Sequence, residues 1–199
     1  MKRTMRKLLT TATLAFFVAT TSAAYAGPAT DVVKAKQTAL FDLLGKTGAD
    51  NEKKVAAIFD EMIDYGALAE ASLGSEWAAR TDAEKKEFSD LLKQIVRKAY
   101  EKNLKKTLNY TIDYVSEEQK DGAFIVTTKA KSKTDAREEA IEIKYKMAQK
   151  DSKWRVQDIT TEGVSLVSSY RSQFTKIIKK DGFPALITKM KDKIAKGDV

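Results

Sequence analysis

The segment TDAEKKEFSDLLKQIVRKAYEKNLKKTLNYTIDYVSEEQKDGAFIVTTK, residues 81–129, decides the fold, because the spacing of its apolar residues changes halfway along it. In the first half they recur every three or four residues, which predicts a long amphipathic helix. Thr81 and Glu84 form the Thr-x-x-Glu pattern of a capping box at its start. The apolar stripe consists of Phe88, Leu91, Leu92, Ile95, Val96, Ala99, Tyr100 and Leu104. From residue 109 onward apolar and polar residues alternate, which is the period of a β-strand.

The alternation continues in later segments and predicts four consecutive antiparallel strands. The alternating segments cover residues 109–116, 124–129, 141–147 and 154–157. Asp121-Gly122 and Lys150-Asp151-Ser152 are turn signals between them. Two of these strands have one polar and one apolar face, so helices are expected to cover one side of the sheet.

Helical spacing surrounds the strands on both sides. Upstream we expect a helix over Ala29–Lys46, with Thr30 as its candidate N-cap, a second helix capped by Asn51, and a short third helix ending at Gly74. Downstream a stripe from Val164 to Ile178 predicts a helix, and a last one begins near Pro184. The mature chain is therefore predicted to be one α+β domain.

The first 26 residues are typical of an export signal. A basic stretch with Lys2, Arg3, Arg6 and Lys7 precedes an apolar run of about 12 residues, which is too short to span a membrane. Ala24-Tyr25-Ala26 offers small residues at a cleavage site. We therefore expect cleavage after Ala26 and a single domain over residues 27–199.

Composition excludes several kinds of chemistry. The chain has no Cys and no His, so it lacks disulfides, thiolate nucleophiles and the commonest ligand of catalytic zinc. The leader holds four of the 36 basic residues and none of the 28 acids, so the mature chain carries a net charge of +4. That excess is too small to indicate a nucleic-acid-binding protein. We expect no metal and no cofactor.

Two stretches resemble a known family. The first contains Ile63-Asp64-Tyr65, Leu73-Gly74 and Trp77, followed by Thr81, Phe88 and Tyr100. The more specific one comprises residues 154–158, WRVQD, residues 162–167, EGVSLV, and residues 170–174, YRSQF. In order and spacing these are similar to the MlaC family, also called the toluene-tolerance family, of periplasmic proteins linked to ABC transporters.

This resemblance implies a fold and a function. The fold would be a cone of the nuclear-transport-factor-2 type, in which a four-stranded curved antiparallel sheet and its covering helices enclose an apolar cavity. The protein would be no enzyme but a periplasmic carrier that shields phospholipid acyl chains. It would shuttle lipid between an outer-membrane lipoprotein complex and an inner-membrane ABC transporter complex with a lipid-binding subunit, maintaining outer-membrane lipid asymmetry and touching membrane surfaces transiently.

The residues expected to bind lipid come from the helix stripe, the apolar sheet face and the C-terminal stripe. They are Leu92, Val96, Tyr100, Phe124, Val126, Ile143, Trp154, Val164, Val167 and Tyr170. Without the resemblance, such stripes would be interpreted as an ordinary core. The resemblance leaves the cargo open, because a hopanoid or another lipid is an alternative to a phospholipid.

Three further features have two interpretations each. Asp158 follows an apolar strand and would need a partner if buried, for which Arg171 is the candidate; contact with a lipid headgroup is the alternative. Trp77 either joins short helices or forms the cavity rim. Residues 176–196 carry a net charge of +5 and either rest on an anionic membrane or acidic partner, or form a solvated face.

Two rival functions are also considered. An isomerase could use Asp158 as a base with Tyr145 or Tyr170, but only analogy between folds supports it. A periplasmic adaptor that binds protein instead of lipid would present an exposed apolar patch.

Overall fold

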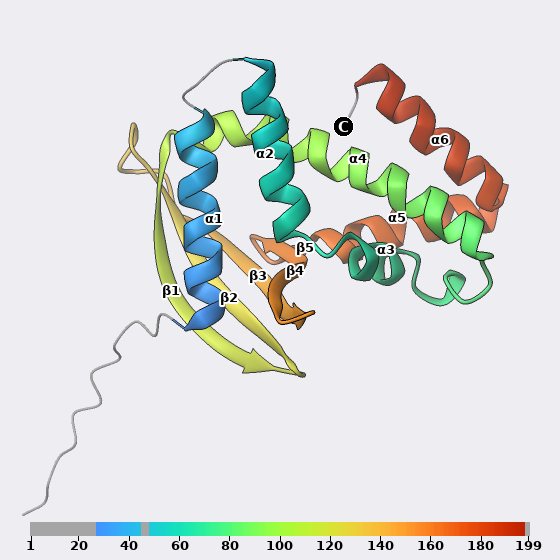
Figure 1. Ribbon diagram of the computed structural model, residues 1–199, viewed down its shortest axis with the longest axis horizontal. Coiled ribbons are helices and arrows are strands. Elements are labelled where there is room, and N and C mark those ends of the chain that lie inside the picture. Colours follow the sequence, from blue (N-terminus) through green and yellow to red (C-terminus); the bar gives the residue numbers. More distant parts are fainter. Residues whose placement is uncertain (1–26, 45–47, 198–199) are drawn as a thin grey trace, which may run out of the picture.

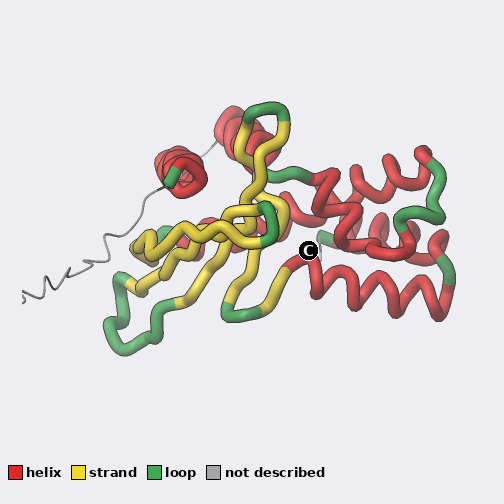
Figure 2. Tube along the Cα trace, turned by 90° about the horizontal axis from the view of Figure 1, so that it is seen from below, coloured by secondary structure: helices red, strands yellow, loops and turns green. Residues whose placement is uncertain are grey.

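A computed structural model describes residues 27–44 and 48–197. It confirms the predicted α+β class, with a long curved antiparallel sheet beside a group of helices (Figure 1, Figure 2). The expected leader, residues 1–26, lies outside the described residues, so the cleavage site and the single-domain boundary remain predictions. No helix within the described ranges is long and apolar enough to cross a membrane.

The longest helix, α4 (Asp82–Thr107), begins where the capping box predicts. The Glu84 carboxylate accepts a 2.8 Å bond from the Thr81 amide, and the Thr81 hydroxyl accepts a 3.3 Å bond from the Glu84 amide. These reciprocal bonds satisfy donors that a helix start leaves free.

The apolar stripe of α4 packs against α3 (Tyr65–Leu73), α5 (Leu166–Asp181) and α6 (Phe183–Lys196). We call this cluster the helical core. Phe88 is fully buried in it, and its ring meets the Phe174 ring edge-on at 5.4 Å. A short 3₁₀ turn, η1 (Gly74–Glu76), follows α3.

Four long strands form the sheet as the alternation predicts. They are β1 (Tyr110–Lys120), β2 (Ala123–Ser132), β3 (Ile141–Lys150) and β4 (Lys153–Thr161), paired in chain order. Asp121-Gly122 and Asp151-Ser152 form the two tight turns, and all four residues have positive φ angles, as such hairpins require. The register shifts once in β1, next to Val115, and once between β3 and β4. Such bulges bend strands and increase their twist.

A fifth strand, β5 (Val164–Ser165), was not predicted. Glu162 and Gly163 have φ angles of 50° and 78°, so they reverse the chain and pair Thr161 with Val164. Val164 therefore lies in a strand, and the prediction that it belongs to a helical stripe is wrong. The helix α5 begins two residues later, at Leu166, because the Ser165 hydroxyl accepts a bond from the Ser168 amide and caps it.

Two helices lie over the same face of the sheet, α1 (Pro28–Leu44) and α2 (Ala49–Met62) (Figure 1, Figure 2). Here the predicted starts are wrong. The first helix begins at Pro28, and Thr30 lies inside it. The second begins at Ala49 after Gly48, while the Asn51 side chain bonds to the Leu43 carbonyl.

The apolar face of the sheet and the helices above it form a second cluster, which we call the sheet core. A parallel bridge between Ile63 and Val156 attaches the end of α2 to β4, and the Asp64 amide donates a 2.9 Å bond to the Val156 carbonyl. The buried members of the sheet core are Ala29, Val33, Met62, Val126, Tyr145, Met147, Val156 and Ile159.

Candidate functional site

The sheet core and the helical core meet at Tyr100. This residue, near the C-terminal end of α4, packs against both clusters, and its ring lies 5.6 Å from the Phe59 ring. We call this contact region the seam. Apolar side chains approach Tyr100 from the sheet and from the helices, so the two clusters are in contact there.

The structure divides the ten predicted lipid-binding residues between the two clusters. Leu92, Val96 and Val167 are buried in the helical core, where Tyr170 stacks on Phe174 at 5.3 Å. Val126 lies fully buried in the sheet core, and Tyr100 joins the two clusters. Three more residues pack at the edge of the sheet core, namely Phe124, Ile143 and Trp154.

Val164 does not share this environment. It is 63% exposed in β5, outside both clusters. The reason is the turn at Glu162-Gly163, which holds the residue in a hairpin instead of on the inner face of a helix.

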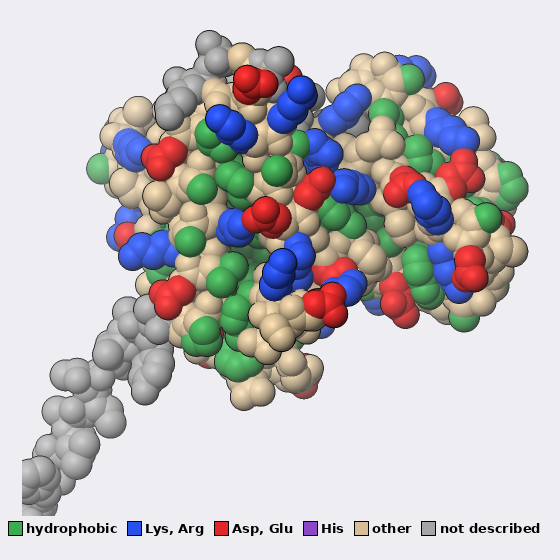
Figure 3. Space-filling view, in the orientation of Figure 1, with side chains coloured by type: hydrophobic (Ala, Val, Ile, Leu, Met, Phe, Trp, Pro, Cys, Tyr) green, Lys and Arg blue, Asp and Glu red, His purple; other side chains and the backbone are tan. Residues whose placement is uncertain are grey.

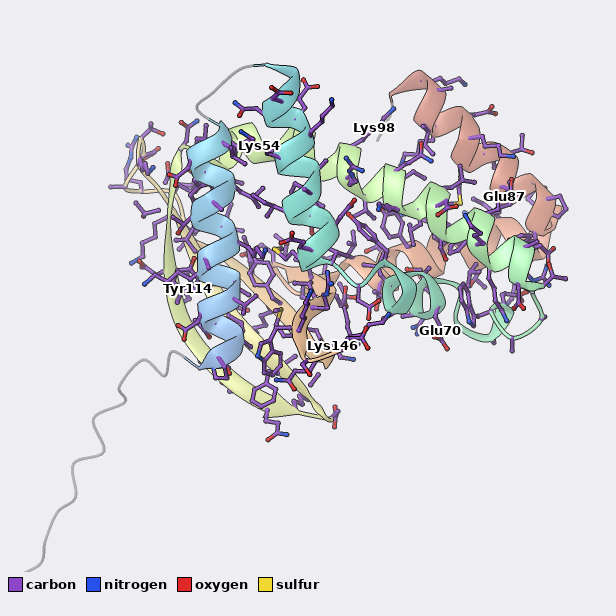
Figure 4. All side chains as sticks on the ribbon, viewed as in Figure 1. Lys54, Glu70, Glu87, Lys98, Tyr114 and Lys146 are labelled. Atoms are coloured by element: carbon purple, nitrogen blue, oxygen red, sulfur yellow. The ribbon has the colours of Figure 1, made fainter. Side chains whose placement is uncertain are left out.

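A hydrogen-bonded group interrupts the apolar surface beneath α1. The Gln37 amide donates a 2.8 Å bond to the Tyr145 hydroxyl on β3 and accepts a 2.5 Å bond from the Tyr114 hydroxyl on β1. Tyr114 points toward α1 in Figure 4. One side chain of α1 is thus bonded to two strands, and two buried hydroxyls are satisfied. Sequence reasoning missed Gln37, although a polar residue between Val33 and Leu40 on a buried helix face was a signal.

Burial keeps the interior tyrosines neutral. It raises the pKa of Tyr114 to about 12, and it raises the pKa values of Tyr100 and Tyr145 further, with neighbouring hydroxyls as a smaller cause. Burial also raises the pKa of Tyr170. The seam therefore carries hydroxyl donors and acceptors but no phenolate at neutral pH.

Asp158 has a structural environment, and the predicted ion pair with Arg171 is wrong. Its carboxylate accepts bonds from the Ser165 hydroxyl at 2.6 Å and from the Val167 amide at 3.0 Å. Arg171 instead donates from Nε to the Ala71 carbonyl on α3 at 2.8 Å. Asp158 thus ties β4 to β5 and to the first turn of α5, where a negative charge is favourable.

Two hollows lie near this junction. One, of about 240 Å³, lies between α3, β3, β4 and α5, and its lining includes Lys146, Asp158 and Arg171. The other, of about 470 Å³, runs along the outer side of α5. Three hydroxyl and three cationic side chains line it, namely Ser168, Arg171, Ser172, Thr175, Lys176 and Lys179. Neither hollow is lined by Tyr100 or by a buried residue of the sheet core, so neither coincides with the seam.

Trp77 lies where it can join helices. It is partly buried against the helical core, and the Lys85 ammonium is 5.6 Å from its ring centroid. This position, away from the seam residues of the sheet core, favours the joining interpretation over the cavity rim.

The basic C-terminal segment is only partly paired. Lys189 pairs with Asp181, and Lys191 pairs with Glu87 on α4. In the part of the chain that the structure describes, Lys176 and Lys179 form no ion pair and remain exposed along α5. The face with α1 and α2 in front presents cations and carboxylates intermixed (Figure 3).

In the described residues, no group of three or more Asp or Glu side chains lies close enough together to hold a metal ion.

Comparisons with known proteins agree with the geometry. No curated protein matches the chain. A solved structure, the phospholipid-binding protein from Ralstonia solanacearum in complex with a phospholipid, is similar with a TM-score of 0.71 at 20% identity. The match covers 87% of this chain and all of that one, which shows a shared fold. The sequence profile described as MlaC protein matches residues 30–192. The chain therefore belongs to the MlaC family.

Proposed function

We propose that this protein is a periplasmic carrier that binds a phospholipid, with the acyl chains held in the apolar interior at the seam. The observation that carries the proposal is the meeting of two apolar clusters at Tyr100, within a fold shared with a phospholipid-binding protein. The acyl chains would lie between the sheet and the helices, in contact with side chains of both cores.

The energetics favour such a carrier. Each buried methylene is worth about 0.8 kcal/mol against water, so two chains of about 15 methylenes would gain roughly 24 kcal/mol. A free lipid would therefore almost never leave a membrane unaided. Against a bilayer the gain is small, because hydrocarbon replaces hydrocarbon. The carrier lowers the barrier to desorption, and its partners would set the direction of transport.

The exposed surface favours a lipid carrier over an adaptor that binds another protein. In the described ranges, the exposed large hydrophobic residues are Val115 and Val164, at 42% and 63% exposure. Single exposed residues do not make a docking patch of the kind that an adaptor or chaperone needs. The interior tyrosines and the satisfied Asp158 likewise offer no free base, so we propose no enzymatic activity.

Contact with a membrane would depend on positive charges on α5. The side of α5 with Arg171, Lys176 and Lys179 offers cations and hydroxyls to phosphate groups. We propose that this side contacts an anionic membrane surface during transfer between an outer-membrane lipoprotein complex and an inner-membrane ABC transporter complex. The process would maintain outer-membrane lipid asymmetry.

Native mass spectrometry of the freshly purified, exported protein tests the proposal. We expect added masses of one phospholipid, which organic solvent releases, and uptake of labelled phospholipid from vesicles. Release of a hopanoid would support the carrier function and would identify a different lipid as its cargo. A protein that carries no lipid and takes up none would contradict the proposal.

A further inference from the structure

The first turn of α1 rests against the carboxylate of Glu117, which lies on β1. Both the amide and the hydroxyl of Thr30 donate 2.7 Å bonds to Glu117 Oε2. The other oxygen of the carboxylate faces Gly27, where an added β-carbon would clash with Glu117 Oε1. Any residue larger than glycine at this position would have to displace the Glu117 carboxylate.

This contact also limits the distance between the Gly27 nitrogen and the Glu117 carboxylate. The nitrogen and the β-carbon position of one residue are about 2.5 Å apart, so the Gly27 nitrogen lies within about 5 Å of Glu117 Oε1. At that separation, opposite charges stabilise each other appreciably. In the described residues no Lys or Arg forms an ion pair with Glu117, and its carboxylate accepts hydrogen bonds from the amide and hydroxyl of Thr30.

The dipole of α1 also acts on a charge at Gly27. Because α1 begins at Pro28, its positive dipole end lies beside Gly27. An α-ammonium group there would be repelled by the helix, whereas a carboxylate beside it is favourable. The Glu117 carboxylate can offset the charge of the ammonium group and the positive end of the helix dipole, because it already accepts a hydrogen bond from the Thr30 amide in the first turn.

We infer that Glu117 is the binding site for the α-ammonium group that cleavage after Ala26 creates on Gly27. The uncleaved chain has a neutral amide at this nitrogen, so the ion pair forms only in the processed protein. It would pin α1 to β1 over the sheet core, and removal of the leader would complete the attachment of this helix. The inference rests on the proposed cleavage site and is independent of lipid binding.

The test uses the exported, processed protein, whose first residue is established by mass spectrometry. The α-amine is acetylated selectively near neutral pH, because its pKa lies well below those of lysines. Urea unfolding then compares free and acetylated forms of the native sequence, of Glu117→Gln and of a matched control, Glu118→Gln. Glu118 is the exposed neighbour on β1, and it accepts a bond from Ser116 of the same strand.

We expect Glu117→Gln to reduce the folding equilibrium constant roughly three- to tenfold more in the free-amine form than in the acetylated form. Glu118→Gln should affect both forms equally. An equal effect of Glu117→Gln on both forms would overturn the inference, as would a processed terminus other than Gly27.

A second measurement needs no Glu117 variant. The α-amine of the native sequence should be acetylated more slowly in the folded protein than in urea, while exposed lysines react at similar rates in both. Equal α-amine rates in the two states would also overturn the inference. Neither measurement depends on lipid content, so failure here is distinguishable from failure of the carrier proposal.

Discussion

The Gln37 side chain lies 2.8 Å from the hydroxyl of Tyr145, in the middle of an otherwise apolar contact between α1 and the sheet. A buried amide in this place is costly unless all its partners are present. The same side chain also accepts from Tyr114, so three residues depend on one another.

Replacing Gln37 with Leu should therefore remove the partner of the Tyr114 hydroxyl and leave the Tyr145 hydroxyl with Thr128 alone. We expect a loss of about 1–3 kcal/mol in the free energy of unfolding, measured by urea denaturation. Adding Tyr114→Phe and Tyr145→Phe to the same chain should recover much of the loss, because the stranded hydroxyls are then gone. A triple variant less stable than Gln37→Leu alone would contradict this account of the loss.

Alkaline pH should weaken the fold through the same tyrosines. Burial raises the pKa of Tyr114 to about 12, whereas an unfolded tyrosine titrates near 10. The folded state therefore binds more protons between these values, and stability falls as pH rises from about 10 to about 12. Urea midpoints across this window should fall less steeply in Tyr114→Phe than in the native sequence. Parallel slopes in the two proteins would contradict the assignment.

Much of the fold follows from the sequence because its determinants are local. The capping box at Thr81 sets the start of α4, and the turn residues at 121–122 and 151–152 set two hairpins. The two-residue strand at Val164 was missed because it is too short to show a period. The hydrogen bonds of Gln37 to two strands, and of Ser165 to Asp158, could not be predicted in the same way. They join residues that only the tertiary fold brings together.

Asp158 should matter for stability and not for lipid. Changing it to Asn removes the charge that accepts from Ser165 and from the first turn of α5, so we expect a loss of about 1.5–3 kcal/mol in unfolding free energy. Lipid recovered by solvent extraction should be unchanged. A double-mutant cycle with Ser165→Ala should give a coupling energy above the error of the measurement. Loss of lipid without loss of stability would revive the headgroup interpretation.

Membrane contact should depend on the exposed side of α5. Reversing two charges, Lys176→Glu with Lys179→Glu, should weaken co-sedimentation with anionic phospholipid vesicles at low salt, and high salt should abolish the difference. The matched control reverses Lys193 and Lys196 on α6, which changes the net charge equally. Equal losses in both pairs would indicate that net charge alone matters. Binding to an acidic protein but not to vesicles would assign this side to a protein partner.

The seam can be distinguished from ordinary core by comparing two aromatic residues. Tyr100 lies where both clusters meet, whereas Phe88 is buried wholly within the helical core. Either residue changed to Ala should cost the lipid-free protein about 3–5 kcal/mol, because each change leaves a cavity.

Bound lipid should change the stability deficit of one variant and not of the other. An acyl chain at the seam can fill the space left by Tyr100→Ala, so the stability difference from the native sequence should shrink when both proteins are loaded with phospholipid. No chain reaches Phe88 in this arrangement, so the deficit of Phe88→Ala should stay constant. Urea unfolding of loaded and delipidated samples measures both differences. If the two deficits respond alike to lipid, the acyl chains do not lie at Tyr100, whatever the protein carries.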